Sequence, residues 1–321
     1  MEGLLAITYR CNARCHMCNT WQYPTIPSEE VQAQNIESLP RMRFANITGG
    51  EPFVREDICD FVEVLSRKAG RIVVSTNGFF SDRIVELAKR YPELGFRISL
   101  EGLPSANDEL RGIKDGFDRG LRTLLRLRAL GRKDIGFGIT LSDRNADDIL
   151  ELYELADSMR VEFATAATHN SFYFHKTDNV IASPDKLAAS LEEVANRLLG
   201  TSRPKNWFRA WFNMGLANYV KGGCRLLPCR MGSDAFFMDP AGTIMPCNGM
   251  DAAMGSLKAQ TFDEIWQSPE AQPIRSRVQA CDRDCWMIGS VAPAMKRNLR
   301  VPLVWVIRSK LAGAAQPATN H

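Results

Sequence analysis

Three cysteines stand close together near the start of the chain, in the sequence Cys11-Asn-Ala-Arg-Cys15-His-Met-Cys18. They follow a short apolar run, Leu4–Tyr9, that we expect to be a β-strand. Three thiolates at this spacing can bind three irons of a [4Fe–4S] cluster and leave the fourth iron open to a ligand from outside the protein. The alternative is a structural zinc site, which needs a fourth donor such as His16. Because His16 lies between the thiols, the spacing favours the cluster.

Four further cysteines form a second group near the other end of the chain. This group can hold another [4Fe–4S] cluster, or a zinc ion that stabilises a small loop-rich module. The spacing alone does not separate the two, but the presence of the first triplet favours iron and sulfur. The four residues are Cys229, Cys247, Cys281 and Cys285, and Gly242 precedes Cys247 by five positions.

The composition is that of an ordinary globular protein. The chain has 321 residues, of which 45% are apolar and 24% charged, enough for two domains or one large α/β domain. The 40 Lys and Arg residues nearly balance 37 Asp and Glu residues, so nucleic acid is not expected as a partner. No apolar run is long enough for a membrane span or a signal peptide. We therefore expect a cytoplasmic protein, in which close cysteines are kept reduced and bind metal.

Short apolar or β-branched runs alternate with segments whose apolar residues recur every three or four positions. Repeated strand–helix units predict an α/β fold with a parallel sheet, curled or open. The first cysteine group would then lie at the carboxyl edge of that sheet, where α/β barrels place their chemistry. The expected strands are residues 4–9, 44–48, 72–75, 96–100, 135–141 and 161–166, and the expected helices between them are residues 58–69, 81–91, 117–130 and 146–159.

The pattern changes after about residue 170. Two helices are expected in succession, residues 183–199 and 206–219, followed by loop-rich sequence with a hairpin that turns at Pro240 and Gly242. A frayed tail is expected from Ala314 onward. The predicted domains are a core at 1–180, a helical bridge at 181–223, a metal-binding module at 224–292, and a C-terminal helix with its tail at 293–321.

The cysteine triplet after the first strand resembles the signature of radical S-adenosylmethionine (SAM) enzymes. Gly49-Gly50-Glu51-Pro52, after the second strand, is similar to the family motif that binds the amino group of SAM through backbone and carboxylate oxygens. In isolation this motif would indicate only a turn with a helix beginning at Pro52. The resemblance implies a partial (β/α)6 TIM-like barrel with a small loop-rich C-terminal iron–sulfur domain.

Further segments are similar to those that contact the ribose and carboxylate of SAM in this family. They are Asn77 after the third strand, Ser99 and Glu101 after the fourth, and Arg111, whose guanidinium suits a carboxylate. The alternatives are a plain turn at Asn77 and a solvated charge at Arg111. Met17 stands where the family usually has an aromatic residue, and its thioether can still cover an adenine.

The second cysteine group resembles the auxiliary-cluster domain of many radical SAM enzymes. The five cysteines from Cys224 onward fit the short form (twitch), with one [4Fe–4S] cluster, better than the longer form (SPASM), with two. Four thiolates would leave this cluster no open iron, so we expect it to transfer electrons.

The resemblance implies that the chain cleaves SAM to a 5′-deoxyadenosyl radical, which abstracts a substrate hydrogen atom. A flavodoxin- or ferredoxin-type protein would supply the electron. Because no peptide-recognition domain precedes the barrel, we expect oxidation of a sugar, cyclitol or similar metabolite, with the auxiliary cluster as electron acceptor. Alternatives are an epimerase with Cys224 as hydrogen-atom donor, a peptide-modifying enzyme and a non-enzymatic protein stabilised by zinc. A molybdopterin-precursor cyclase is disfavoured, because the chain lacks a C-terminal Gly-Gly.

Some residues carry more open interpretations. Cys224 can equally be a spare thiol or a cluster ligand in place of Cys229. Substrate contacts are expected near 163–169, and His169 and Asp234 are candidate bases. The apolar, basic-flanked residues 300–311 are expected to form a helix that packs across the open side of the barrel, binds a partner or lies weakly on a membrane.

Overall fold

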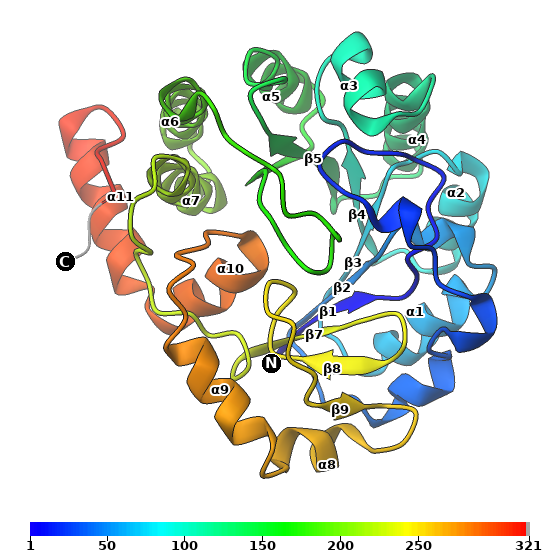
Figure 1. The fold of residues 1–321 in the computed structure, drawn as a ribbon. Coiled ribbons are helices and arrows are strands. Elements are labelled where there is room, and N and C mark those ends of the chain that lie inside the picture. Colours follow the sequence, from blue (N-terminus) through cyan, green and yellow to red (C-terminus); the bar gives the residue numbers. More distant parts are fainter. Residues whose placement is uncertain (319–321) are drawn as a thin grey trace.

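A single sheet of nine strands runs through the computed structural model, which describes residues 1–318 (Figure 1). Its order is β6-β5-β4-β3-β2-β1-β7-β8-β9, and β1 to β6 are all parallel. The expected partial (β/α)6 barrel is confirmed. The six strands are β1 (Glu2–Ala6), β2 (Phe44–Thr48), β3 (Ile72–Thr76), β4 (Gly95–Ser99), β5 (Ile135–Leu141) and β6 (Glu162–Ala167).

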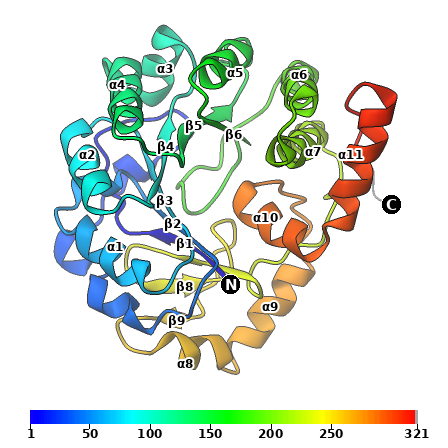
Figure 2. The ribbon, with the colours of Figure 1, turned by 180° about the vertical axis from the view of Figure 1, so that it is seen from behind.

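Helices cover the outer face of the parallel strands, so these strands are buried on both sides and are rich in Val, Ile and Phe (Figures 1 and 2). Five helices occupy this layer: α1 (Ile58–Ser66), α2 (Ser81–Arg90), α3 (Pro104–Arg111), α4 (Gly116–Ala129) and α5 (Ile149–Ser158). All except α3 were expected from apolar periodicity. Short 3-10 helices lie in the connections: η1 (Thr20–Gln22), η2 (Pro27–Glu29), η3 (Ala33–Ser38) and η4 (Pro52–Val54).

The C-terminal part of the chain extends the same sheet. Strand β7 (Ala235–Met238) pairs in parallel with β1, and β8 (Thr243–Met245) and β9 (Gly255–Ser256) follow in antiparallel order. The expected hairpin is confirmed, and Gly242 adopts a φ of 84° at its turn. The expected iron–sulfur module therefore shares its sheet with the barrel, and the domain boundaries stay a prediction.

Helices rather than strands fill the gap between β6 and the C-terminal strands. Helices α6 (Pro184–Gly200) and α7 (Pro204–Val220) pack on each other, and α7 also contacts β6. Trp211 of α7 lies edge-to-face on Trp286, with ring centroids 5.3 Å apart, and the Trp286 indole donates to the carbonyl of Phe212. A Cβ at Gly215 would lie 2.3 Å from the Trp286 ring, so this contact is tight.

The remaining helices are α8 (Phe262–Gln267), α9 (Ala271–Gln279), α10 (Ile288–Arg297) and α11 (Arg300–Ala312). Helix α10 contacts β7, whereas α11 packs on α7 at the edge of the molecule rather than across the open side of the barrel (Figure 2). Gln316 is held by hydrogen bonds to Ser309 and Trp305, so the expected fraying does not begin at Ala314. Residues 319–321 of the expected tail lie outside the described residues.

Replacing Trp286 by Ala is predicted to lower the free energy of unfolding by about 3–5 kcal/mol, because it leaves a cavity where α7 meets the C-terminal segment. Denaturant unfolding under anaerobic conditions measures the change. Trp207→Ala, at a half-buried position of α7, is the matched control and should lower the free energy of unfolding by less. Equal losses in the two variants would contradict the role assigned to Trp286.

Candidate active site

A cavity of about 210 Å³ lies at the carboxyl ends of the barrel strands. Its wall consists of the loop after β1 and of residues at the ends of the next five strands. Glu51 and Pro52 are buried beside the cavity but do not line it. Eleven residues that the sequence singled out do line it: Cys11, Cys15, Met17, Cys18, Gly49, Gly50, Asn77, Ser99, Glu101, Arg111 and His169.

The three thiols of the first group face this cavity from a loop that is largely shielded from solvent. Burial raises the pKa of Cys11 to about 12, and burial also raises the pKa values of Cys15 and Cys18. The positive charge of Arg111 acts against burial and lowers the pKa of each of the three thiols. The Thr20 hydroxyl lies 3.1 Å from the Cys18 sulfur. Metal binding must therefore displace protons from these thiols.

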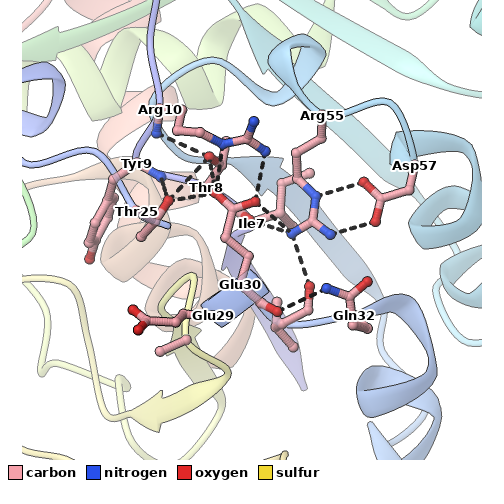
Figure 3. A network of polar contacts seen from close by, with 12 residues as sticks. Ile7, Thr8, Tyr9, Arg10, Thr25, Glu29, Glu30, Gln32, Arg55 and Asp57 are labelled. Atoms are coloured by element: carbon pink, nitrogen blue, oxygen red, sulfur yellow. Dashed lines mark hydrogen bonds and ion pairs between the residues drawn. The ribbon is translucent and has the colours of Figure 1, made fainter. Parts of the chain in front are cut away.

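A buried network of charged and hydroxyl groups anchors the start of the cysteine loop (Figure 3). The carboxylate of Glu30, 2% exposed, accepts hydrogen bonds from the hydroxyls of Thr8 and Thr25 and from Nε and Nη2 of Arg10. Arg55 lies 3.5 Å from the same carboxylate and donates to the carbonyl of Ile7. The chain is thus fixed at the residue just before Cys11.

Helix α3 fixes the other part of the cysteine loop. The backbone N–H groups of Arg14 and His16 donate to the carbonyls of Arg111 and Leu110 at the end of this helix, at 2.9 and 2.8 Å. Gly112 ends α3 with a φ of 54°, and a Cβ there would lie 2.7 Å from the Arg14 carbonyl. The His16 side chain is exposed and does not line the cavity, which is against its proposed role as a zinc ligand.

Arg111 and Glu101 form a buried ion pair in the wall of the cavity, at 2.9 Å. The second oxygen of Glu101 accepts the backbone N–H of Thr140 on β5. Although burial opposes it, the charges of Cys15 and Glu101 raise the pKa of Arg111 above its usual value. Arg111 is therefore a permanent cation beside the thiols, and the alternative of a solvated surface charge is wrong.

Glu51 has a different environment from the one expected. Its carboxylate has no exposed surface and accepts hydrogen bonds from the Thr76 hydroxyl and from the N–H groups of Asn77 and Phe53. Burial raises its pKa, and these hydrogen bonds lower it in opposition. Both carboxylate oxygens are thus engaged inside the protein. The side chain joins the end of β2 to the end of β3, which favours a positioning role and leaves backbone atoms of the motif to meet a ligand.

The two glycines of the same motif are required by close packing. A Cβ at Gly49 would lie 2.3 Å from the Thr8 carbonyl oxygen, and one at Gly50 would lie 2.4 Å from that of Arg10. The motif therefore presses directly against the start of the cysteine loop.

Four buried side-chain polar atoms lack a hydrogen-bond partner within residues 1–318: Asn12 Nδ2, Trp21 Nε1, Arg111 Nε and Thr168 Oγ1. Trp21, Arg111 and Thr168 line the cavity, and Asn12 lies between two residues that do. An unpaired buried donor costs about 1–3 kcal/mol, so such a group is rare without a ligand to meet it. Together with the thiols, these donors fit a metal cluster and a polar molecule that carries a carboxylate.

The segment that follows β6, residues 168–182, folds back into the middle of the barrel (Figure 1). Its Tyr173 hydroxyl donates to the Gly49 carbonyl at 2.9 Å, and Asn19 donates to the Phe174 carbonyl at 2.8 Å. Thr168, His169 and Phe174 complete the cavity wall. The sequence analysis singled out only His169 in this segment, because aromatic residues without periodicity carry no structural signal.

His169 is held in one orientation. Its Nδ1 lies 3.1 Å from the Ala167 carbonyl, which requires that Nδ1 carry the proton and leaves the Nε2 lone pair free. Burial, aided by the charge of Arg283, lowers the pKa of His169. The imidazole is therefore neutral near neutral pH, in the form that accepts a proton.

Two arginines hold backbone carbonyls in the loops that carry the second cysteine group. Cys229 and Cys247 pack against the same small buried cluster of Met231, Ala235 and Val278. Burial raises the pKa of Cys247 to about 11, and the charges of Cys285 and Cys229 act in the same direction. Arg225 donates to the carbonyl of Cys285, and Arg283 donates to that of Gly249. No three His, Cys, Asp or Glu side chains in the described part of the chain lie close enough to hold one metal ion, which does not suit a compact zinc site in either group.

Two candidates from the sequence lie outside the cavity. Cys224 is exposed on the loop after α7, and Asp234 is paired with Arg297 at 2.8 Å. Neither lines the cavity. The role of Cys224 as a hydrogen-atom donor stays a prediction that this position does not favour.

Two protein-family models match the chain. The radical SAM superfamily model matches residues 5–156, and the model of the SPASM iron–sulfur cluster-binding domain matches residues 229–286. Together they imply SAM and two [4Fe–4S] clusters as cofactors.

Three curated relatives are named for synthesis or maturation reactions. Fe-coproporphyrin III synthase of Methanosarcina barkeri is 30% identical over 167 residues, which are 48% of this chain but only 40% of that protein. AdoMet-dependent heme synthase of the same organism is 24% identical over 293 residues, with coverages of 82% and 81%. Sporulation killing factor maturation protein SkfB of Bacillus subtilis is 25% identical over 299 residues, with coverages of 89% and 68%. None of the three is named for a sugar or cyclitol, so the expectation of such a substrate is not supported.

Solved structures show the same fold. Streptococcus suis SuiB bound to the precursor peptide SuiA has a TM-score of 0.63 and 18% identity, with 86% of this chain and 66% of SuiB covered. The family matches and the cavity that the thiols line both favour an iron–sulfur enzyme over a non-enzymatic protein stabilised by zinc. The chain belongs to the radical SAM superfamily and carries a C-terminal SPASM/twitch-type auxiliary [4Fe–4S] cluster domain.

Proposed function

We propose that this protein is a radical SAM oxidoreductase that removes two hydrogens from a substrate held between the cysteine loop and residues 168–174. One observation carries the proposal. A single cavity is lined by the three thiols, by Arg111 and by His169, whose Nδ1 contact to the Ala167 carbonyl leaves Nε2 unbonded, whereas Cys224 does not line the cavity. This arrangement supports oxidation over epimerisation, because epimerisation needs a hydrogen-atom donor beside the substrate.

When bound, the first cluster and SAM supply a 5′-deoxyadenosyl radical that takes a hydrogen atom from the substrate, and the auxiliary cluster supplies an acceptor for one electron. The protein's own task is to orient the reactants. Arg111 presents an unpartnered Nε to the cavity, in the position to bind a carboxylate, while Glu101 holds its guanidinium in place. Asn77 donates to Asn12 at 2.7 Å and so fixes the cysteine loop against β3.

His169 is proposed to accept the proton that leaves the substrate radical. Its Nδ1–H is committed to Ala167, so Nε2 is the acceptor, and the lowered pKa keeps it unprotonated near neutral pH. Loss of a hydrogen atom, a proton and an electron completes a two-electron oxidation. Phe174 lines the cavity beside this imidazole, with ring centroids 5.1 Å apart, and the buried Tyr173 packs behind Phe174, which limits the access of water to a reactive radical.

The substrate group in the cavity is proposed to be uncharged. Among the described residues that line the cavity, Arg111 is the only Arg or Lys, and it already pairs with Glu101 and is proposed to bind the carboxylate of SAM. A tetrapyrrole with several carboxylates would need more cations, so we favour a peptide side chain. The relationship to a maturation protein and the shared fold of a peptide-bound enzyme support this choice.

The ligand assignment predicts the iron content of cysteine variants. The anaerobically purified protein should hold about eight irons, and Cys11→Ala, Cys15→Ala and Cys18→Ala together should leave about four. Removing Cys229, Cys247 and Cys285 in the same way should also leave about four. Cys59→Ala and Cys224→Ala should retain about eight. Loss of the auxiliary iron in the Cys224 variant alone would show that Cys224 is a ligand.

Arg111→Lys should weaken SAM binding at least tenfold, because an ammonium cannot keep both the Glu101 contact and a second contact to a carboxylate. Equilibrium binding of SAM to the iron-loaded protein measures this without turnover. Arg128→Lys, at an exposed position of α4, is the matched control. Unchanged affinity in the Arg111 variant would remove SAM from this part of the cavity.

The proposed reaction is tested with the dithionite-reduced protein, SAM and the peptide fraction of a cell extract. The expected products are 5′-deoxyadenosine and a peptide that has lost two hydrogens, detected by mass spectrometry. His169→Gln should still form 5′-deoxyadenosine but make roughly a hundredfold less oxidised peptide. Cys224→Ala should leave both unchanged.

The same assay has a predicted pH dependence. Because burial lowers the pKa of His169, its basic form is retained at neutral pH, and oxidation should fall only at a pH below the ordinary histidine pKa of about 6.5. In the His169 variant this acid limb should disappear. Deuterium entering an unoxidised peptide from D2O, together with failure of Cys224→Ala, would instead establish epimerisation.

A further inference from the structure

An apolar stripe runs along the outer face of α11. Four of the nine exposed large apolar side chains within residues 1–318 form it, namely Leu299 at the N-cap of α11 and Leu303, Ile307 and Leu311 within the helix, which are 53, 49, 51 and 84% exposed. They are spaced four residues apart, so they lie on one side of the helix. We call this set the α11 stripe.

The opposite face of α11 already attaches the helix to the protein. Trp305 and Val306 are buried on this side, where α11 packs on α7. The Trp305 indole donates to the Gln316 carbonyl at 2.8 Å, and Lys310 lies over the Trp207 ring of α7. A helix that is apolar all round is normally buried on all sides. The fold uses one apolar face of α11 and leaves the stripe at the edge of the molecule, as Figures 1 and 2 both show for the helix.

The charge around the stripe has one sign. No Asp or Glu occurs between Cys285 and His321, although the whole chain is nearly balanced. Among the described residues, Arg300 and Arg308 of α11 have no ion-pair partner, whereas Lys296 and Arg297 are paired with Glu2 and Asp234. The five basic residues of this segment are Lys296, Arg297, Arg300, Arg308 and Lys310.

We propose that α11 binds the surface of an anionic membrane, with the stripe inserted at the level of the lipid headgroups. Helices that lie in this interface combine an apolar face with Lys and Arg residues that reach the phosphates. A protein partner is disfavoured, because a ridge of four side chains falls well short of the roughly 800 Å² that each partner contributes to a standard interface. The helix cannot cross the bilayer, and no helix in residues 1–318 has the length and apolarity to do so.

The test is co-sedimentation of the full iron-loaded protein with lipid vesicles. Binding is expected to vesicles of phosphatidylcholine with phosphatidylglycerol and to be much weaker to phosphatidylcholine alone. Arg300→Gln with Arg308→Gln should weaken binding by about fivefold for each charge. Leu303→Ser with Ile307→Ser and Leu311→Ser should abolish it. Leu125→Ser, at an equally exposed position on α4, is the matched control and should bind as the unmodified protein does.

Iron content and the thermal unfolding midpoint should be the same in all variants, because the substituted side chains are exposed. If the unmodified protein sediments with neither kind of vesicle, the proposal is wrong. It is also wrong if the stripe variant binds as well as the control, or if the stripe proves to hold two copies of the chain together in solution. None of these results would affect the proposed oxidation, which is measured without lipid.

Discussion

Glu101 and Arg111 form an ion pair that is almost completely removed from solvent, and the active-site region is arranged around it. Each charge alone would be costly to bury, so the pair is stable only while both partners and their hydrogen bonds stay in place. Glu101 is tied to β5 through Thr140, and Arg111 ends α3, whose last carbonyls hold the cysteine loop. The Glu101–Arg111 ion pair therefore fixes both the position of the Arg111 charge beside the thiols and the path of the cysteine loop.

The segment after β6 couples the first cysteine group to the second. Asn179 donates to the carbonyl of Met17, next to Cys18, and Arg283, between two auxiliary cysteines, donates to the carbonyl of Asn170. A single stretch of chain thus contacts both groups and also forms part of the cavity wall. A substrate that enters beside His169 would therefore contact the same segment that is hydrogen-bonded to both cysteine loops.

The barrel strands were predictable because buried parallel strands are nearly continuous apolar runs. The cysteine spacing was informative because few kinds of site other than a metal cluster require three thiols so close together in the sequence. Helix α3 was missed because Leu110 is the only large apolar residue among its eight, which leaves no periodicity. Its remaining signals were Pro104 at its start and Gly112 after its end. The engagement of the Glu51 carboxylate by Thr76 and Asn77 could not be predicted, because it depends on how two neighbouring strands end in space.

The most direct test of the account is electron paramagnetic resonance of a variant that lacks Cys229, Cys247 and Cys285. Only the first cysteine group can then carry a cluster, so its signal is observed alone after reduction with dithionite. The account predicts a [4Fe–4S] signal that changes shape when SAM is added, because the first cysteine group and Arg111 are proposed to hold the cluster and SAM in the same cavity. A reduced cluster whose signal is the same with and without SAM would contradict it.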